Sequence, residues 1–389
     1  MLLSKKLSCS IIMALTLALS VLFTSMQANS AFAEPNFGAV GDWGCTSSTK
    51  STVSNIRSHN SPEKIFALGD YSYTSTPTCW LNIIDAIKSR TRIAIGNHED
   101  DSNEGYSSYL SAFGMSTTYQ AFTYGNARII VMDTDHFSYN VGSNQYNFVI
   151  SQLQQASQDS AIKWIIVYMH KEMYTSPNTC GASNCQNTNS EISNLRNIWH
   201  PKFDQYGVDV VLMGHVHNYQ RTFPIKYDSG SPSSPTITST ASTEYSDPTG
   251  EIFALVGTGG VNFHGLSGKA SWVKYQQDSR FGALDLSIEN NGYTLAGRYY
   301  TNDKVQRDVF KITKTGTAQY SFGPSLSLSG KQASSTLSGE DASVGISGGD
   351  VNAKNGQDNG KNLGQANGQG KGLDCEHFKQ QVPRPERCR

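Results

Sequence analysis

Short apolar runs, rich in Ile, Val and Phe, recur along this chain, and almost every one ends in Gly, Asp, Asn or His. Runs of this length and composition are typical of buried strands. Helical spacing occurs between them: Ile192, Leu195 and Trp199 lie three or four positions apart, and Gly207 follows as a helix stop. This alternation predicts a layered α/β domain rather than an all-β barrel. The predicted elements are strands at Phe37–Val40, Lys64–Leu68, Arg92–Ile95, Arg128–Met132, Trp164–Met169, Val208–Met213 and Glu251–Val256, and helices at Tyr146–Ala156 and Ile192–Tyr206.

Three later segments alternate apolar and polar positions, which favours antiparallel strands with one buried face. We expect these strands to close the second half of the domain. They are Ala283–Ile288, Tyr293–Tyr300 and Val305–Ile312.

The first 33 residues have the features of a secretory signal peptide. Lys5 and Lys6 give a basic start, Ile11–Phe23 is uncharged and largely apolar, and Ala31–Ala33 offers a small-residue cleavage site. A membrane anchor is the alternative, but this apolar run of 13 residues is shorter than the roughly 20 that a span needs. We therefore expect cleavage after Ala33, a secreted or extracytoplasmic protein, and no transmembrane segment in the mature chain.

Charge gives no support for nucleic acid as a partner. Without Lys5 and Lys6, 29 of the 31 basic residues remain against 32 acidic ones, so the net charge is −3. No long basic run is left, and a basic face is what nucleic-acid binding requires.

Six of the seven cysteines lie beyond the signal, an even number in an exported chain. Six cysteines allow 15 connectivities, so the sequence does not fix the pairing. A cysteine metal site is the alternative, but the CxxC pairs that zinc usually takes are missing. The local interpretation, in which each bridge closes a loop within one region, pairs Cys45 with Cys79, Cys180 with Cys185, and Cys375 with Cys388.

The composition changes after Phe322. Ser, Gly, Asn, Gln and Lys dominate as far as Gly372, with almost no large apolar residue, so we expect a flexible tail that does not fold. The expected organisation is a signal peptide at 1–33, one folded domain at 34–322, the tail at 323–372 and a short cysteine-containing segment at 373–389.

Five polar blocks directly follow predicted strands, and together they hold carboxylates, an amide, a phenol and three imidazoles near the strand ends. Ligands of open α/β sheets bind at the carboxyl ends of the strands, where these blocks would meet. Carboxylate and imidazole together suit Fe, Mn or Zn. The blocks are Gly41–Gly44, Gly69–Tyr73, Gly96–Glu99, Val167–His170 and Gly214–His217.

Each block alone also has a structural explanation. The Gly-Asp pairs at Asp42 and Asp70 are common turn residues, and a histidine that ends a buried strand, such as His170, is often a hydrogen-bonded core residue. His215 and His217 are harder to explain by packing, because packing seldom needs two imidazoles separated by one residue. In an extended segment, both rings would be able to point the same way and reach one cluster. The ordered set of five favours one site with two metal ions.

In this order the blocks resemble those of the calcineurin-like metallophosphoesterases. Tyr73, at the end of the second block, makes them similar to the purple acid phosphatases in particular. The resemblance covers about residues 36–315, and it implies that 34–322 is a catalytic domain. The implied fold is α/β, with two mixed β-sheets packed as an αββα sandwich and the metals between the carboxyl edges of the sheets.

The same resemblance implies a ligand set. One metal would be held by Asp42, Tyr73 and His217, the other by Asn97, His170 and His215, with Asp70 bridging. The cofactor would be a binuclear centre of Fe(III) with Fe, Zn or Mn, and Tyr73 on ferric iron would give a purple colour.

The implied activity is hydrolysis of small-molecule phosphate monoesters at acid pH by a secreted acid phosphatase. A metal-bound hydroxide would attack phosphorus in line, because two ions lower the pKa of water and clamp the phosphate oxygens. We expect His98, beside Asn97, to hydrogen-bond the phosphate as a catalytic residue; a structural role behind the ligands is the alternative.

The chain departs from the plant pattern after His170. Plant members carry a further histidine there that is thought to protonate the leaving alcohol, whereas Tyr174–Asn189 contains none. His98, His136 and His264 remain as candidates for this proton donor, and His200 is expected to serve helix packing.

Two other functions stay open from the sequence. One is a phosphodiesterase or nucleotide hydrolase of the same superfamily, because loops such as 100–120 and 174–190 would decide the substrate. The more remote one is a non-catalytic binding protein of the cell envelope, although the intact ligand set argues against it.

Overall fold

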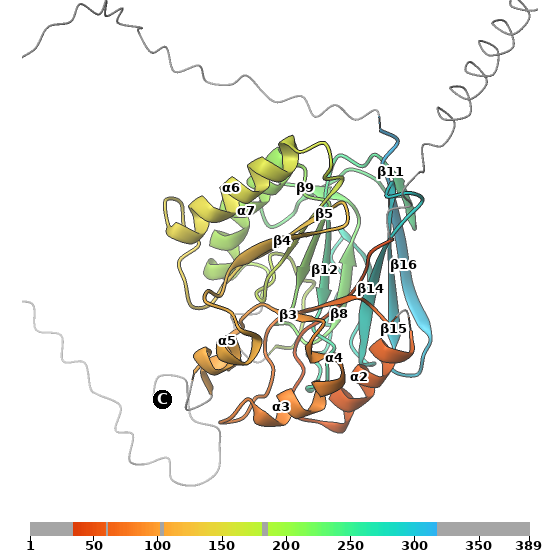
Figure 1. Ribbon diagram of the computed structural model, residues 1–389. Coiled ribbons are helices and arrows are strands. Elements are labelled where there is room, and N and C mark those ends of the chain that lie inside the picture. Colours follow the sequence, from red (N-terminus) through yellow and green to blue (C-terminus); the bar gives the residue numbers. More distant parts are fainter. Residues whose placement is uncertain (1–33, 60, 102–104, 181–185, 317–389) are drawn as a thin grey trace, which may run out of the picture. The chain divides into compact units, whose positions relative to one another are not determined.

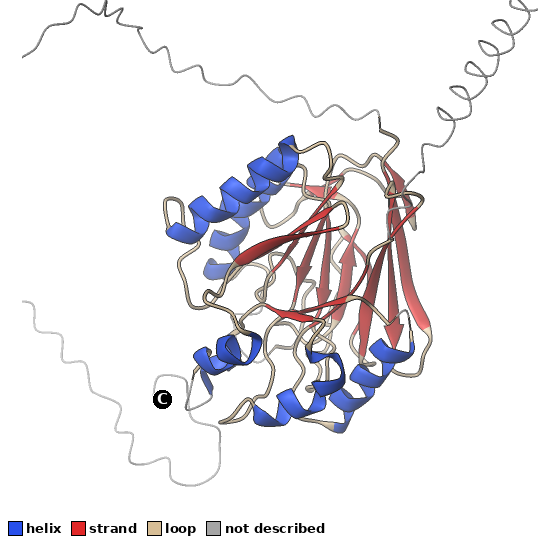
Figure 2. Cartoon of the chain, viewed as in Figure 1, coloured by secondary structure: helices blue, strands red, loops and turns tan. Residues whose placement is uncertain are grey.

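Two seven-stranded mixed β-sheets stand face to face in this protein, with helices on their outer faces (Figure 1). The computed structural model describes residues 34–59, 61–101, 105–180 and 186–316. The cartoon coloured by secondary structure shows the two groups of strands and the helices that flank them (Figure 2). This arrangement is the α/β two-sheet sandwich expected from the sequence, and that expectation is confirmed.

The first sheet carries three parallel strands at one edge, antiparallel pairings from β1 through β14 and β15 to β16, and a parallel pairing of β16 with β11 at the other edge. Its order is β11-β16-β15-β14-β1-β2-β3, and β1 runs parallel to β2 but antiparallel to β14. The strands are β1 (Asn36–Val40), β2 (Lys64–Ala67), β3 (Thr91–Ile93), β11 (Glu244–Ser246), β14 (Gly282–Glu289), β15 (Thr294–Thr301) and β16 (Gln306–Thr313).

The second sheet has four parallel strands at its centre. Its order is β13-β8-β12-β7-β6-β5-β4, and β5, β6, β7 and β12 are parallel. The strands are β4 (Gln120–Tyr124), β5 (Ala127–Val131), β6 (Trp164–Tyr168), β7 (Val210–Met213), β8 (Tyr219–Thr222), β12 (Ile252–Val256) and β13 (Val273–Gln277). A separate short pair consists of β9 (Ile225–Lys226) and β10 (Thr236–Ile237).

The two longest helices of the described residues, α6 and α7, begin at capping residues. Asn189 caps the start of α7 by accepting from the backbone N–H of Glu191 at 2.8 Å, and Gly207 ends it in the left-handed conformation. Ser143 caps α6 in the same way. The helices are α2 (Ser47–Ser58), α3 (Thr78–Ile83), α4 (Asp85–Lys88), the 3₁₀ helix η1 (Asn97–Asp101), α5 (Ser107–Phe113), α6 (Asn144–Gln158) and α7 (Ser190–Tyr206).

The central strands β6, β7 and β12 of the second sheet are apolar on both faces because each face covers a different core. In β6, Trp164, Ile166 and Tyr168 point into the core between the sheets, whereas Ile165 and Val167 point into the core beneath α6 and α7. The run Trp164–Met169 is continuously apolar for this reason. Because these strands pack on both faces, the loops at their carboxyl ends are held in place by two packed layers.

Every predicted strand and helix is present, with ends shifted by one or two residues. The apolar criterion missed β8, because Gln220 and Arg221 are polar yet buried, with the Arg221 guanidinium donating to Asp308 at 2.6 Å. The predicted disulfide between Cys45 and Cys79 is present.

Several predictions concern residues outside the described part of the chain. These are the signal peptide, the tail, the final segment with Cys375 and Cys388, and Cys185 as the partner of Cys180. Within the described residues, none of the helices has the length and apolar character needed to cross a membrane.

Candidate metal centre

The seven predicted metal ligands lie together where the carboxyl ends of the two sheets face each other. The first sheet supplies the oxygen donors, which follow β1, β2 and β3: Asp42, Asp70, Tyr73 and Asn97. The second sheet supplies the imidazoles, which follow β6 and β7: His170, His215 and His217. The site therefore exists only because the two sheets pack against each other.

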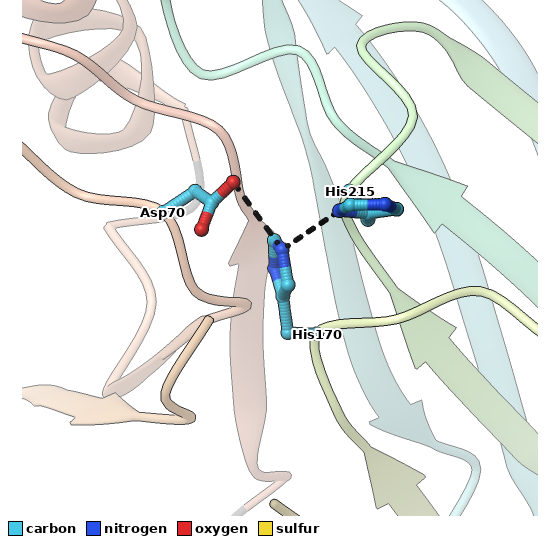
Figure 3. Close-up of side chains that lie close together, drawn as sticks. All are labelled: Asp70, His170 and His215. Atoms are coloured by element: carbon cyan, nitrogen blue, oxygen red, sulfur yellow. Dashed lines mark hydrogen bonds and ion pairs between the residues drawn. The ribbon is translucent and has the colours of Figure 1, made fainter. Parts of the chain in front are cut away.

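One group of ligand atoms is centred on His170. Its Nε2 atom lies 3.3 Å from Oδ2 of Asp70, 3.2 Å from Oδ1 of Asn97 and 3.2 Å from Nδ1 of His215. Figure 3 shows the His170 ring between Asp70 on one side and His215 on the other. Asp70, His170 and His215 are buried, and their ligand atoms lie within 4.8 Å of one another.

A second group shares Asp70 with the first. It joins Asp42, Asp70 and His217, whose ligand atoms also lie within 4.8 Å of one another. The Tyr73 hydroxyl sits among them, 3.1 Å from Oδ2 of Asp70, 3.1 Å from Nε2 of His217 and 3.4 Å from Oδ1 of Asp42. The two groups match the two sets implied by the resemblance, and Asp70 is the residue common to both.

Backbone carbonyls fix the orientation of two of the imidazoles. Nδ1–H of His170 donates to the Leu68 carbonyl at 2.8 Å, and Nδ1–H of His217 donates to the Asn262 carbonyl at 2.8 Å. In both rings this leaves Nε2 as the atom that faces the other donors. Such outer contacts are typical of metal-binding histidines, because they set the tautomer and hold the ring.

Four of the seven residues have a left-handed backbone, which side chains other than glycine rarely adopt. The φ angles are 60° for Asp42, 55° for Asp70, 53° for Tyr73 and 72° for His215. Strain of this kind persists only where the surroundings enforce it, and it concentrates at functional sites. Gly69, with φ of 89°, lies against the His170 ring, and a Cβ there would come within 2.5 Å of Nδ1.

Glu99 has a structural role that the sequence analysis did not assign. Its buried carboxylate accepts from the backbone N–H groups of Asp70 at 3.0 Å, Tyr71 at 2.8 Å and Gly96 at 2.6 Å. It thereby ties the loop after β2 to the loop after β3, which carry Asp70 and Asn97. The sequence signal that could have indicated this role is the position of Glu99, a charged residue directly after a histidine and close to the end of an apolar strand.

The site favours a cation. Burial would raise the pKa of Asp70, but the neighbouring His170 outweighs it and holds this pKa below its ordinary value. Burial and the carboxylates of Asp70 and Asp42 raise the pKa of Tyr73 well above 10, so this phenol keeps its proton unless a cation displaces it. Two carboxylates, a phenol and an amide next to three imidazoles form a donor set that suits iron, zinc or manganese.

His98 lies at the rim of this cluster. Its backbone N–H donates to Oδ1 of Asp70 at 2.9 Å, its ring lies 4.3 Å from the Tyr73 ring, and its side chain is 34% exposed. The exposed ring beside the buried donors is accessible to a ligand from solvent.

The two other candidate histidines differ in their surroundings. His264 stacks on His217 with ring centroids 3.9 Å apart, and its Nδ1 accepts from the His217 backbone N–H at 3.1 Å. His136 lies outside both ligand groups, with Nε2 at 3.1 Å from Oδ2 of Asp100 and Nδ1 at 3.6 Å from Oδ1 of Asp133. His200 is buried in α7.

Residues 35–219 match the family model for calcineurin-like phosphoesterases. The structure is similar to that of purple acid phosphatase PPD1 from yellow lupin seeds, with a TM-score of 0.60 and 21% sequence identity over 72% of this chain and 54% of that one. The chain is a calcineurin-like metallophosphoesterase with distant similarity to purple acid phosphatases.

Sequence relatives support the same class at low identity. Purple acid phosphatase 15 of Arabidopsis thaliana is 23% identical over 280 residues, which are 61% of this chain and 47% of the relative. Acid phosphatase type 7 of Homo sapiens is 28% identical over 185 residues, which are 42% of this chain and 39% of the relative. The chain thus spans less than half the length of each of these two relatives.

Proposed function

We propose that this protein is a secreted binuclear-metal phosphatase that hydrolyses phosphate monoesters at acid pH. The observation that carries the proposal is the pair of ligand groups that share Asp70 at the facing ends of the two sheets. A metal-dependent phosphoesterase is the coarser statement that the family match supports. Acid pH, monoester preference and the identity of the ions are our proposal.

The donor set suggests how two ions would be held. Asp42, Tyr73 and His217 would hold Fe(III), and Asn97, His170 and His215 would hold Fe, Zn or Mn, with Asp70 common to both. When bound, such a pair polarises phosphoryl oxygens and acidifies a water for attack on phosphorus. Tyr73 would release its proton to solvent when a ferric ion binds the phenol oxygen, because a cation there offsets the effect of the two carboxylates.

His98 is proposed to bind the phosphoryl group. Its backbone N–H donates to Asp70, its ring packs on the Tyr73 ring, and its side chain is partly exposed at the rim of the site. A donor fixed in this way stabilises negative charge that develops on the phosphoryl oxygens in the transition state.

The surroundings favour His136 over His264 as the source of the proton for the leaving group. Burial and the neighbouring His217 together lower the pKa of His264 to about 4, so His264 is neutral above that pH. Burial would also lower the pKa of His136, but Asp133 and Asp100 outweigh it and raise this pKa. His264 is better suited to position His217, on which it stacks.

A disulfide bond within the folded domain supports secretion. The Cys45–Cys79 disulfide joins the loop after β1 to the start of α3, and bridges of this kind persist in oxidising compartments. The amino-terminal pattern of Lys5, Lys6 and the apolar run points to the same destination.

A substrate comparison tests this function. The purified protein, loaded with iron and zinc, is assayed on 4-nitrophenyl phosphate and on bis(4-nitrophenyl) phosphate at acid and at neutral pH. We expect faster hydrolysis of the monoester, a higher rate at acid pH, loss of activity with a chelator, and recovery when the ions return. Faster hydrolysis of the diester would favour the phosphodiesterase alternative. Hydrolysis of neither ester by the loaded protein would contradict both.

A further inference from the structure

A third group of metal-ligand side chains lies at the opposite end of the second sheet. His200 and Asp204 belong to α7, and Glu251 directly precedes β12, whose carboxyl end points toward the candidate metal centre. One ligand atom from each of the three lies within 4.8 Å of the others. We propose that His200, Asp204 and Glu251 bind one Zn²⁺ ion that stabilises the fold, independently of the proposed phosphatase site.

The backbone holds the three side chains on regular elements. His200 and Asp204 are four residues apart on one face of α7. Glu251 pairs with Ile225 through two backbone hydrogen bonds, of 2.9 and 3.0 Å. Gly250 permits this pairing, because a Cβ there would come within 2.5 Å of the Ile225 carbonyl oxygen. The donors are therefore preorganised rather than carried on a free loop.

The donor atoms are buried, and the side chains nearest to them belong to the group itself. His200 is fully buried and Glu251 is 1% exposed, and in the described part of the chain neither Nε2 of His200 nor either carboxyl oxygen of Glu251 forms a well-aligned hydrogen bond with a side chain outside the group. Oδ1 of Asp204 is in the same condition. No Lys or Arg among the described residues forms an ion pair with either carboxyl group. Buried polar groups in this state need a partner.

The His200 ring is oriented as a metal ligand requires. Its Nδ1 lies 2.7 Å from the Tyr174 hydroxyl, which donates to the Pro232 carbonyl at 3.3 Å. The hydroxyl oxygen can therefore accept from Nδ1–H, which leaves the Nε2 lone pair facing Oε2 of Glu251 at 3.4 Å. Ligand atoms about 2.1 Å from a tetrahedral zinc ion are about 3.4 Å apart, so this separation fits.

There is space for one ion beside the two carboxyl groups. A small cavity of about 20 Å³ is lined by Asp204, Asp209, Glu251 and the turn at Pro248–Gly250, and His200 lies outside this lining. A volume of this size admits one water molecule or one cation. One imidazole with two carboxylates and an open position for water is a donor set that zinc accepts.

Without a metal, the two carboxyl groups bind protons more strongly than ordinary carboxyl groups do. Burial raises the pKa of Glu251 to about 8, and burial together with Glu251 raises the pKa of Asp204 to about 7. Burial lowers the pKa of His200 to about 4, which leaves its ring neutral and able to coordinate. A divalent cation would displace the protons from the two carboxyl groups, as metals do at carboxylate sites.

Metal counting tests the third site. The full chain is saturated with Zn²⁺ and desalted, and zinc per chain is measured by mass spectrometry for wild type, Glu251→Gln and Asp204→Asn. We expect each variant to hold about one zinc fewer than wild type. Glu244→Gln, the same change at an exposed position outside the group, should keep the wild-type count. Tyr174→Phe should keep the site but weaken its zinc affinity by about 10–100-fold.

Equal zinc counts in wild type and in both folded ligand variants would overturn the proposal, and would show that the three side chains only share protons. Glu251 is buried, so its variant could fail to fold; Asp204 is partly exposed, and Asp204→Asn then carries the test. Loss of phosphatase activity alone would not decide the matter, because the third site shares no residue with the proposed active site.

Discussion

At the scale of residues, the candidate metal ligands could be predicted from the sequence, whereas the groups that hold them in position could not. Asp42, Asp70 and His170 stand in sequence where strands end, so their types and order indicated a metal site. The Leu68 and Asn262 carbonyls that orient His170 and His217 could not be predicted, because every residue has a carbonyl and only the fold brings these two into contact. The three backbone N–H groups that donate to the Glu99 carboxylate could not be predicted either, for the same reason.

Tyr73 decides whether one ion is ferric. We predict a visible absorption band in the iron-loaded protein that disappears in Tyr73→Phe while the fold persists, because the ring packing on His98 is retained. Absorption spectra of both proteins at equal iron content check this. Tyr71→Phe is the matched control, since the Tyr71 hydroxyl donates to the Ala67 carbonyl at 3.1 Å and not to the cluster. A band that survives Tyr73→Phe would refute the assignment of Tyr73 as an iron ligand.

At the scale of elements, the strands with apolar runs were predicted to within one or two residues. Elements whose buried positions are polar were missed, as β8 was, because Gln220 and Arg221 satisfy their polar atoms only through distant partners such as Asp308. The order in which the strands pair could not be predicted from the sequence either. The run around Ala283 predicted an antiparallel strand, but not that β14 would pair with β1, a contact between residues far apart in the chain.

A buried acid in β14 makes stability depend on pH. Burial raises the pKa of Asp285 to about 7 against an ordinary value of 3.8, and Arg298 only partly offsets this, because its guanidinium donates to Glu289 at 2.6 Å. The folded state therefore holds a proton that the unfolded state loses between those values, so the stability contribution of Asp285 falls as pH rises through this window.

Asp285→Asn should remove this dependence. We predict that the melting temperatures of variant and wild type are close at about pH 4 and that the variant is more stable at about pH 8, by at most about 4 kcal/mol in the free energy of unfolding. Calorimetry at the two pH values measures the difference. A difference of the same size at both would show that Asp285 keeps an ordinary pKa.

At the scale of the whole molecule, the candidate centre results from the packing of the two sheets. The parallel strands β1, β2 and β3 bring oxygen donors to one edge, and β6 and β7 bring imidazoles to the facing edge. Neither sheet alone carries a complete ligand group, since Asp70 comes from the first and His170 with His215 from the second. Asp70 is the single residue that belongs to both groups, so it is the most informative position in the chain.

The turnover of 4-nitrophenyl phosphate by Asp70→Asn, compared with wild type at equal metal supply, tests the central claim most directly. Asn keeps the size of Asp70 but removes the negative charge that both ligand groups share. Asp85→Asn, the same change at an exposed position in α4, serves as the control and should keep wild-type turnover. We predict that turnover by Asp70→Asn falls to background while its circular dichroism matches wild type. Turnover close to that of wild type would contradict a catalytic centre built around Asp70.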